Sequence, residues 1–190
     1  WGDVGPDARV DSLETRGPMG YDEMNQAREP GNYGWPMFIG NNFAYNKYNY
    51  ETGESGRFFD PEKPINDSKN NTGLRELPPA KPAYVYYHYG DIQDFPQVGS
   101  GSRNAMAGPT YWSDMYPNGG GLPSYYDGKV IIYDWMRGWM MAVHLFEDGT
   151  FNKMEPFAPD IELHNLIDME MSPDGRVYLL EYGSGWFSAN

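Results

Sequence analysis

The sequence predicts an all-β fold built from propeller-like blades, and three observations lead to this prediction. The motif Asp-Gly-basic-Val, followed by apolar residues and an acid, occurs twice, and the copies at Asp127 and Asp174 are 47 positions apart. That spacing lies within the roughly 40–50 residues of a propeller blade. The chain of 190 residues also contains 23 Gly and 16 Pro, which leave little room for long helices. Its aromatic content of 16% is typical of a β-rich protein with elaborate loops.

Each copy of the motif predicts a tight turn followed by a buried strand. Asp-Gly favours the positive φ angles of such a turn, and the apolar runs at 130–135 and 177–182 are typical of strands. The opening "WGDVG" is similar to the end of a further copy, and residues 140–151 predict the next strand and turn. Strands are also expected within residues 84–89 and 104–112. The chain is therefore expected to form about three blades of one propeller domain over residues 1–190.

Residues 41–82 interrupt this pattern. They lack hydrophobic periodicity and are rich in Asn, Gly, Pro and charged residues, so they predict a long loop insertion. A shorter insertion is expected at residues 7–20. Because three blades alone would expose unpaired strand edges and half a core, the remaining propeller blades are expected elsewhere in the parent chain.

The composition excludes several classes of function. The chain has 14 Lys and Arg against 27 Asp and Glu, a formal net charge of -13, so nucleic acid is not an expected partner, whereas a divalent metal is. It has no Cys, which excludes disulfides and zinc-thiolate sites. No apolar run approaches the ~20 residues of a membrane span. No P-loop, dinucleotide fingerprint or Gly-x-Ser-x-Gly elbow is present.

Two regions carry candidate site residues. Asp22 and Glu23 precede a Gly-rich aromatic turn, and calcium takes six to eight oxygen ligands of the carboxylate, amide and main-chain kinds available there. An acidic pair in a loop can equally be solvated or cap a turn. In the second region, His164 precedes a strand while Arg137 follows one, at positions that a propeller presents to its central opening. The residues expected to line a ligand site are His164, Arg137, Asp134 and Trp135, with Trp35, Trp135 and Trp186 stacking on a sugar face.

Several stretches, taken together and in order, carry a family resemblance. Asp-Glu-Met-Asn at 22–25 followed by Gly-Asn-Tyr-Gly-Trp-Pro at 31–36 resembles the signature of the glucose/sorbosone dehydrogenase family. "GDVGP" at 2–6, "AMAGP" at 105–109 and "YYDGKVIIYDWMRGW" at 125–139 agree with it. The resemblance implies a six-bladed β-propeller that binds pyrroloquinoline quinone (PQQ) and calcium. It further implies oxidation of a carbohydrate or polyol hydroxyl in a periplasmic or secreted protein.

The resemblance also implies two calcium sites. The main-chain oxygens of Gly5 and Pro6 match the family's ligands for the calcium that touches the quinone, and Gly17-Pro18 is a competing match. A second, structural calcium is implied at Glu23 and at the main chain of Tyr33 and Ile39, with the amides of Asn41 and Asn42 where the family has a carboxylate. The catalytic base is expected in blades outside this segment.

The sequence departs from the family where the quinone carboxylates are held. Asn165-Leu166-Ile167 stands before Asp168, where the family has two Arg separated by one residue, and Met136 occupies a position expected to be basic. The sequence is therefore compatible with three functions. The first is a quinoprotein-like sugar or polyol dehydrogenase, and the second is a non-catalytic, calcium-stabilised propeller that binds carbohydrate or a protein partner. The third is a structural module whose 41–82 segment makes assembly contacts.

Overall fold

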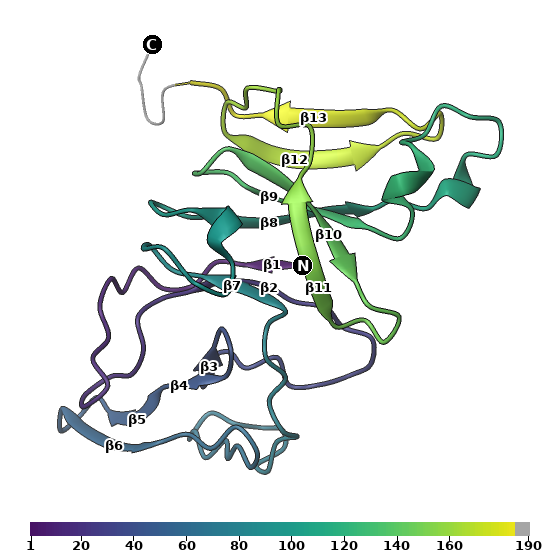
Figure 1. The fold of residues 1–190 in the computed structure, drawn as a ribbon. Helices are drawn as coiled ribbons and strands as arrows, with labels where there is room; N and C mark the ends of the chain where they lie inside the picture. The colour runs from purple at the N-terminus through teal and green to yellow at the C-terminus, as the bar shows by residue number, and fades with distance from the viewer. Residues whose placement is uncertain (185–190) are drawn as a thin grey trace. The chain divides into compact units, whose positions relative to one another are not determined.

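The computed structural model describes residues 1–184 and is built from small antiparallel sheets, with no α-helix among these residues (Figure 1). Three single-turn 3-10 segments lie at Pro96–Val98, Ser113–Met115 and Ser124–Tyr126. The chain divides into two compact units, Asp3–Tyr89 and the rest. No helix in the described part of the chain is long and apolar enough to cross a membrane. The prediction of an all-β protein is confirmed.

The C-terminal unit contains a four-stranded antiparallel meander and a hairpin. Strands β8 (Ala105–Thr110), β9 (Val130–Asp134), β10 (Trp139–Leu145) and β11 (Phe151–Pro156) form one sheet in the order β11-β10-β9-β8 (Figure 1). Strand β12 (Leu166–Met171) pairs with β13 (Val177–Glu181), and β12 lies beside β8. Apolar side chains of β9, β10 and β12 make the core, because alternate residues of each strand point to one face. The buried core residues are Ile131, Tyr133, Met140, Ala142, Phe157, Leu166 and Met169.

The two Asp-Gly motifs occupy equivalent positions. Each precedes the second strand of a hairpin, β8-β9 or β12-β13, and its glycine has a positive φ of 70° at Gly128 and 83° at Gly175. Glycine adopts this backbone region without the steric cost that a Cβ would add. The predicted turn and strand are present at both copies, and β9 is buried as expected. The expectation of a buried strand is wrong for β13, where Tyr178 and Leu180 are each more than half exposed.

Equivalent hydrogen bonds join the start of the first strand to the end of the second strand in the hairpins β8-β9 and β12-β13. The amide of Trp135 donates to the carbonyl of Asn104 at 3.2 Å, and the amide of Tyr182, 47 positions later, donates to the carbonyl of Asn165 at 2.9 Å. The carboxylate that ends each second strand accepts from the amide of a residue shortly before the first strand. The sequence repeat therefore corresponds to a repeated structural joint.

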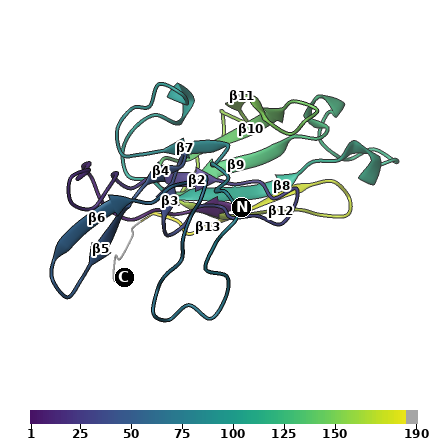
Figure 2. The same cartoon turned by 90° about the horizontal axis from the view of Figure 1, so that it is seen from below.

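The N-terminal unit is made of shorter strands. Strand β2 (Asp22–Met24) pairs antiparallel with β7 (Val85–Tyr87) in a sheet of order β1-β2-β7, where β1 is Gly2–Asp3. Strands β3 (Phe38–Ile39) and β4 (Phe43–Ala44) form one hairpin, and β5 (Asn46–Asn49) and β6 (Glu54–Phe58) form another. Figure 2 shows β5 and β6 side by side as a two-stranded ribbon. The largest fully buried apolar side chains of this unit are Met24, Phe38, Val85 and Tyr87.

Residues 41–82 are more ordered than a loop insertion. Their first half contains β4 and the β5-β6 hairpin, and their second half is fixed mainly by main-chain hydrogen bonds such as Asn66 N to the carbonyl of Arg75 at 2.8 Å. The β5-β6 hairpin could not be predicted from the sequence. Every residue of β6 is exposed, so this strand lacks the alternation of apolar and polar residues that indicates a half-buried strand.

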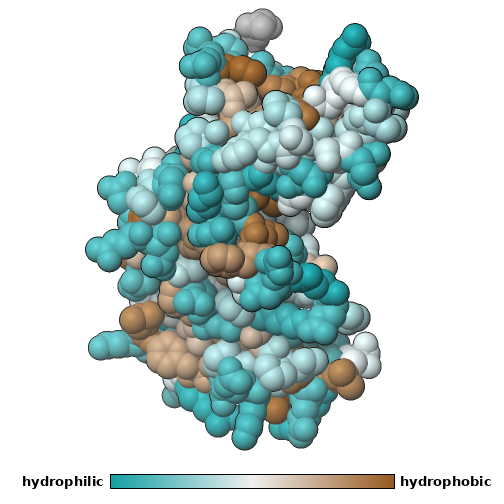
Figure 3. Space-filling view, turned by 45° about the vertical axis from the view of Figure 1, so that its right-hand side comes forward, coloured by the Kyte–Doolittle hydropathy of each residue, from teal (hydrophilic) through white to brown (hydrophobic). Residues whose placement is uncertain are grey.

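Exposed apolar residues are distributed over the surface. On the face drawn in Figure 3, hydrophobic residues form separate patches among hydrophilic ones. Val10, Leu74 and Met115 are each more than 60% exposed. Single exposed apolar residues are normal for a folded protein and mark no interface by themselves.

Candidate functional site

The acidic pair at Asp22 and Glu23 lies on a buried strand. Pairing of β2 with β7 places Glu23 opposite Tyr86, and only 6% of Glu23 and none of Asp22 is exposed. One Asp22 oxygen accepts the amide of Gly5 at 3.1 Å. The two Glu23 oxygens accept from the amide of Gly40 and, at 2.9 Å, from the side-chain amide of Asn25.

The electrostatic environment of Glu23 favours a cation. Burial raises the pKa of its carboxyl, against the lowering effect of the two hydrogen bonds, and the nearby Asp3 and Asp22 raise it further. A buried carboxylate among like charges is destabilised unless a positive charge compensates it. No Lys or Arg contributes to this balance, so the charge of this carboxyl is removed by a proton or compensated by a bound cation.

A small cavity lies beside Glu23. It has a volume of about 10 Å³, close to that of one water or small ion, and is lined by Asp3, Val4, Gly5, Tyr21, Glu23, Trp35 and Ile39. The backbone at Gly5 lies so close to the backbone at Tyr21 that a Cβ on Gly5 would be 1.8 Å from the carbonyl oxygen of Tyr21. Three of the residues expected to hold calcium, namely Gly5, Glu23 and Ile39, thus meet at one cavity.

Three other expected metal ligands lie elsewhere in this unit. Pro6 lines a larger groove together with the competing Gly17-Pro18, and the Asn42 amide donates to the carbonyl of Ala80 at 2.9 Å. The main-chain carbonyl of Tyr33, which is the group that the resemblance implies as a ligand, accepts the amide of Trp35 at 3.3 Å. Within residues 1–184, no group of three or more Asp, Glu or His side chains has the geometry of a metal site. Calcium binding at this corner would therefore rely on main-chain oxygens as well as carboxylates.

Asp134 and Arg137 organise a turn in the C-terminal unit. The fully buried Asp134 carboxylate accepts the amides of Met136 at 2.8 Å, Arg137 at 2.7 Å and Asn104 at 2.9 Å. The Arg137 guanidinium donates to four carbonyl oxygens of the segment 98–102, at 2.7–3.1 Å. These hydrogen bonds to main-chain carbonyls show that the Arg137 side chain holds the segment 98–102 in place.

The remaining predicted site residues surround this turn or lie outside it. The carbonyl of Trp135 accepts the side-chain amide of Asn165 at 3.2 Å, and the Trp135 ring contacts Tyr182 edge-on at 6.0 Å. His164 is exposed, and its backbone amide donates to Glu181. Trp186 lies outside the described residues. Trp135 and His164 thus lie where the end of the β8-β9 hairpin contacts the start of the β12-β13 hairpin.

Trp35 borders a groove in the N-terminal unit that is large enough for an oligosaccharide. The groove has a volume of about 720 Å³. Trp35 is 58% exposed and meets the ring of Tyr45 edge-on at 6.2 Å, while Tyr50 is 83% exposed and meets Tyr48 at 4.9 Å. We call it the aromatic groove and define it by its lining residues Trp35, Met37, Tyr45, Tyr48, Tyr50 and Phe59.

Two polar side chains complete the aromatic groove. The Arg16 guanidinium lies over the ring of Tyr48, with its carbon 4.4 Å from the ring centroid. Asn46 is 9% exposed; its amide donates to the carbonyl of Gly56 at 3.2 Å, and its buried oxygen has no hydrogen-bond partner among the described residues. That oxygen is inaccessible to solvent, so the guanidinium of Arg16 is the polar group that the groove offers to a ligand.

The sequence indicated only part of this groove. Trp35 was expected to stack on a sugar, but Arg16, Asn46, Tyr48 and Tyr50 were missed because they belong to segments interpreted as loop insertions. The available signal was the run "AYNKYNY" at 44–50, in which three tyrosines accompany two asparagines. Three tyrosines so close together in a polar segment cannot all be buried in a core, so some of their rings are expected at the surface.

Comparison of the chain with protein-family models, curated proteins and solved structures finds no match.

Proposed function

We propose that this chain is part of a calcium-stabilised β-propeller of the glucose/sorbosone dehydrogenase type, and that it binds a carbohydrate in the aromatic groove. The observation that carries the proposal is the groove itself, in which exposed Trp35 and Tyr50 rings accompany the guanidinium of Arg16. Sugars present apolar C–H faces to aromatic rings and hydroxyl acceptors to such donors.

The propeller part of the proposal rests on repetition. The β8-β11 meander has the four antiparallel strands of a propeller blade, and the joints at Trp135 and Tyr182 recur at the blade-like spacing of 47 residues. The blades that would complete the ring belong to the parent protein.

Calcium fits the corner at Glu23. Glu23 and Asp3 would provide carboxylate oxygens, and Gly5 and Ile39 would provide main-chain oxygens around the small cavity. Calcium accepts this mixture of ligands. Bound there, it would neutralise the buried acids and fix the chain around the 31–40 turn, which also carries Trp35 of the groove.

A titration of the full chain with neutral trisaccharides of glucose, xylose and mannose, followed by tryptophan fluorescence, tests the proposal. We expect saturable binding of at least one trisaccharide, and at least about fivefold weaker binding by Trp35→Ala, since a stacking aromatic contributes roughly 1–3 kcal/mol. Trp112→Ala is the matched control, because Trp112 is 50% exposed and does not line the groove. Equal weakening by both variants, or no binding, would contradict the proposal.

Oxidation of the bound sugar is a second candidate function. It is favoured by the family resemblance alone, since the cavity brings Gly5, implied for the quinone calcium, together with Glu23 and Ile39, which the resemblance assigns to the separate structural calcium. The described residues do not fit the quinone equally well. Arg137 is directed at main-chain carbonyls, and Asn165-Leu166-Ile167 stands in the place of the paired Arg. Anionic quinone carboxylates require cations.

Reconstitution distinguishes the two functions. PQQ and calcium would be added to the full-length parent protein, and absorbance and dye reduction would be followed with a panel of aldoses. Calcium-dependent quinone binding with turnover would establish the enzyme, with cations supplied by other blades. Calcium binding without quinone binding would leave the carbohydrate-binding function alone.

A further inference from the structure

We infer that the carbohydrate bound in the aromatic groove is acidic, and that Arg57 binds the carboxylate of a uronic acid residue. This inference rests on the proposed carbohydrate-binding function and deepens it. It is carried by the distribution of charge, by a second pocket that continues the groove, and by the position of Arg57.

Charge is distributed unevenly along this acidic chain. The net charge is -13, yet residues 41–82 contain six basic and six acidic residues and are neutral overall. This segment therefore holds six of the 14 Lys and Arg in fewer than a quarter of the positions. The six cations are Lys47, Arg57, Lys63, Lys69, Arg75 and Lys81. An anionic ligand is repelled least here.

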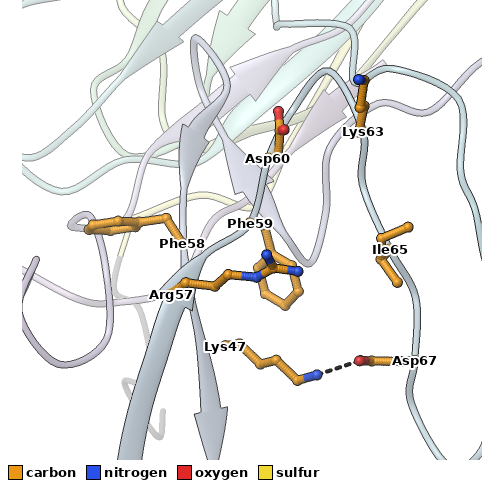
Figure 4. Close-up of a pocket in the computed structure, with 8 residues that line it drawn as sticks. All are labelled: Lys47, Arg57, Phe58, Phe59, Asp60, Lys63, Ile65 and Asp67. Carbon is orange, nitrogen blue, oxygen red and sulfur yellow. Dashed lines mark hydrogen bonds and ion pairs between the residues drawn. The ribbon is translucent and has the colours of Figure 1, made fainter.

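The aromatic groove continues into a pocket that contains three of these cations. The pocket has a volume of about 520 Å³, and Lys47, Phe59, Ile65 and Asp67 line both it and the groove. Its other lining residues are Arg57, Phe58, Asp60 and Lys63 (Figure 4). A chain of sugars that stacks in the groove can thus extend into the pocket without leaving the protein surface.

Arg57 is the cation placed to bind a ligand. Figure 4 shows its guanidinium reaching into the pocket beside the Phe59 ring, whereas Phe58 turns the other way. Lys47 forms an ion pair with Asp67, and Asp60 accepts the amide of Glu62 at 3.0 Å. Within residues 1–184, Arg57 forms no ion pair. Its guanidinium is therefore available to an anion.

The chemistry of Arg57 favours a carboxylate over a phosphate. A guanidinium matches a planar carboxylate with two parallel hydrogen bonds. A phosphate group carries nearly two charges at neutral pH and would need more than one available cation, but Lys47 is already paired and Lys63 points away from Arg57 in Figure 4. A single carboxylate on a sugar ring fits one arginine beside an aromatic side chain.

Calorimetric titration of the full chain with an aldotriouronic acid, which is a neutral disaccharide carrying one uronic acid residue, and with its methyl ester tests the inference. The two ligands share length and stereochemistry and differ in charge, and calcium is held equal in both titrations. We expect the acid form to bind at least tenfold more tightly than the ester, with an affinity that falls as salt is added. Arg57→Gln should remove this preference and leave the affinity for the ester unchanged.

Two further variants sharpen the test. Arg57→Lys should restore part of the preference, because it keeps the charge and loses the two-pronged geometry. Arg75→Gln is the matched control from the same segment, does not line the pocket, and should bind as the parent does.

The outcomes separate the inference from the proposed function. Equal affinity for acid and ester, or a preference that survives Arg57→Gln, would overturn the acidic ligand and leave carbohydrate binding intact. If neither these ligands nor the neutral trisaccharides bind, the proposed function falls and the inference falls with it.

Discussion

Replacing Glu23 by Gln should make the protein at least as stable as wild type without calcium and less stable than wild type with calcium. In the absence of metal, the wild-type protein holds a buried carboxylate whose pKa is raised mainly by burial and further by Asp3 and Asp22. A raised pKa in an acid stabilises the fold at low pH, and this contribution is lost as pH rises through the raised value. Glutamine has the same shape, accepts the Gly40 amide and carries no charge. Above that pH, Glu23→Gln should therefore be at least as stable as wild type in a chelator.

Calcium should reverse the order. A ligand that binds only the folded state at 100 times its dissociation constant adds about 2.7 kcal/mol to the free energy of unfolding. For a chain of this size, that gain corresponds to a rise in melting temperature of roughly 5–10 °C. Glu23→Gln should lose most of the rise, because it removes the carboxylate of the cavity.

Thermal unfolding in calcium and in chelator, between pH 4 and pH 8, measures both effects. Glu62→Gln is the control, since Glu62 is exposed and does not line the small cavity. An equal rise with calcium in wild type and Glu23→Gln would refute the calcium corner. A rise that does not depend on pH would refute the role of the buried acid.

Three other substitutions test separate parts of the structure. Gly5→Ala should cost more than about 2 kcal/mol of unfolding free energy, since its Cβ would lie 1.8 Å from a carbonyl oxygen, and denaturant unfolding would measure this loss. Arg137→Met should cost about 2–3 kcal/mol and speed hydrogen exchange in the loop that the guanidinium contacts. The pKa of Glu155 is lowered to about 2 by hydrogen bonds from Tyr125 and His144. Glu155→Gln should therefore remove about 1 kcal/mol at neutral pH, a difference that disappears between pH 4.5 and pH 2 in acid-unfolding experiments.

Each substitution has a matched control. Gly73→Ala would meet only a side-chain oxygen at 3.5 Å, Arg176→Met removes an arginine whose side chain is 73% exposed, and Glu147→Gln changes an exposed acid. All three should stay within about 0.5 kcal/mol of wild type. A control as costly as its partner substitution would contradict the assigned contact.

The strands of the C-terminal unit were predictable because their signals are local. Asp127-Gly128 and Asp174-Gly175 set the turns, and an apolar run follows each of them, so the position of β9 and β13 follows from nearby residues. Burial was less predictable, because β9 is buried and β13 is mostly exposed. The acids that close each hairpin, Asp134 and Glu181, recur at the same spacing.

The groove was less predictable because it is assembled from distant segments. Arg16 meets Tyr48 and Trp35 meets Tyr45 only after the chain folds back. Arg137 illustrates the same limit: a basic residue at a strand end indicates an anion site, but its donors turn to carbonyls of residues 98–102. Local patterns specify strands and turns, whereas side-chain partners depend on packing between elements.

A crystal structure of the protein grown with calcium and a bound trisaccharide would test the central claim most directly. We expect sugar rings stacked on Trp35 and Tyr50, a ligand hydroxyl at the guanidinium of Arg16, and calcium beside Glu23. A trisaccharide bound elsewhere, with the aromatic groove empty, would contradict it.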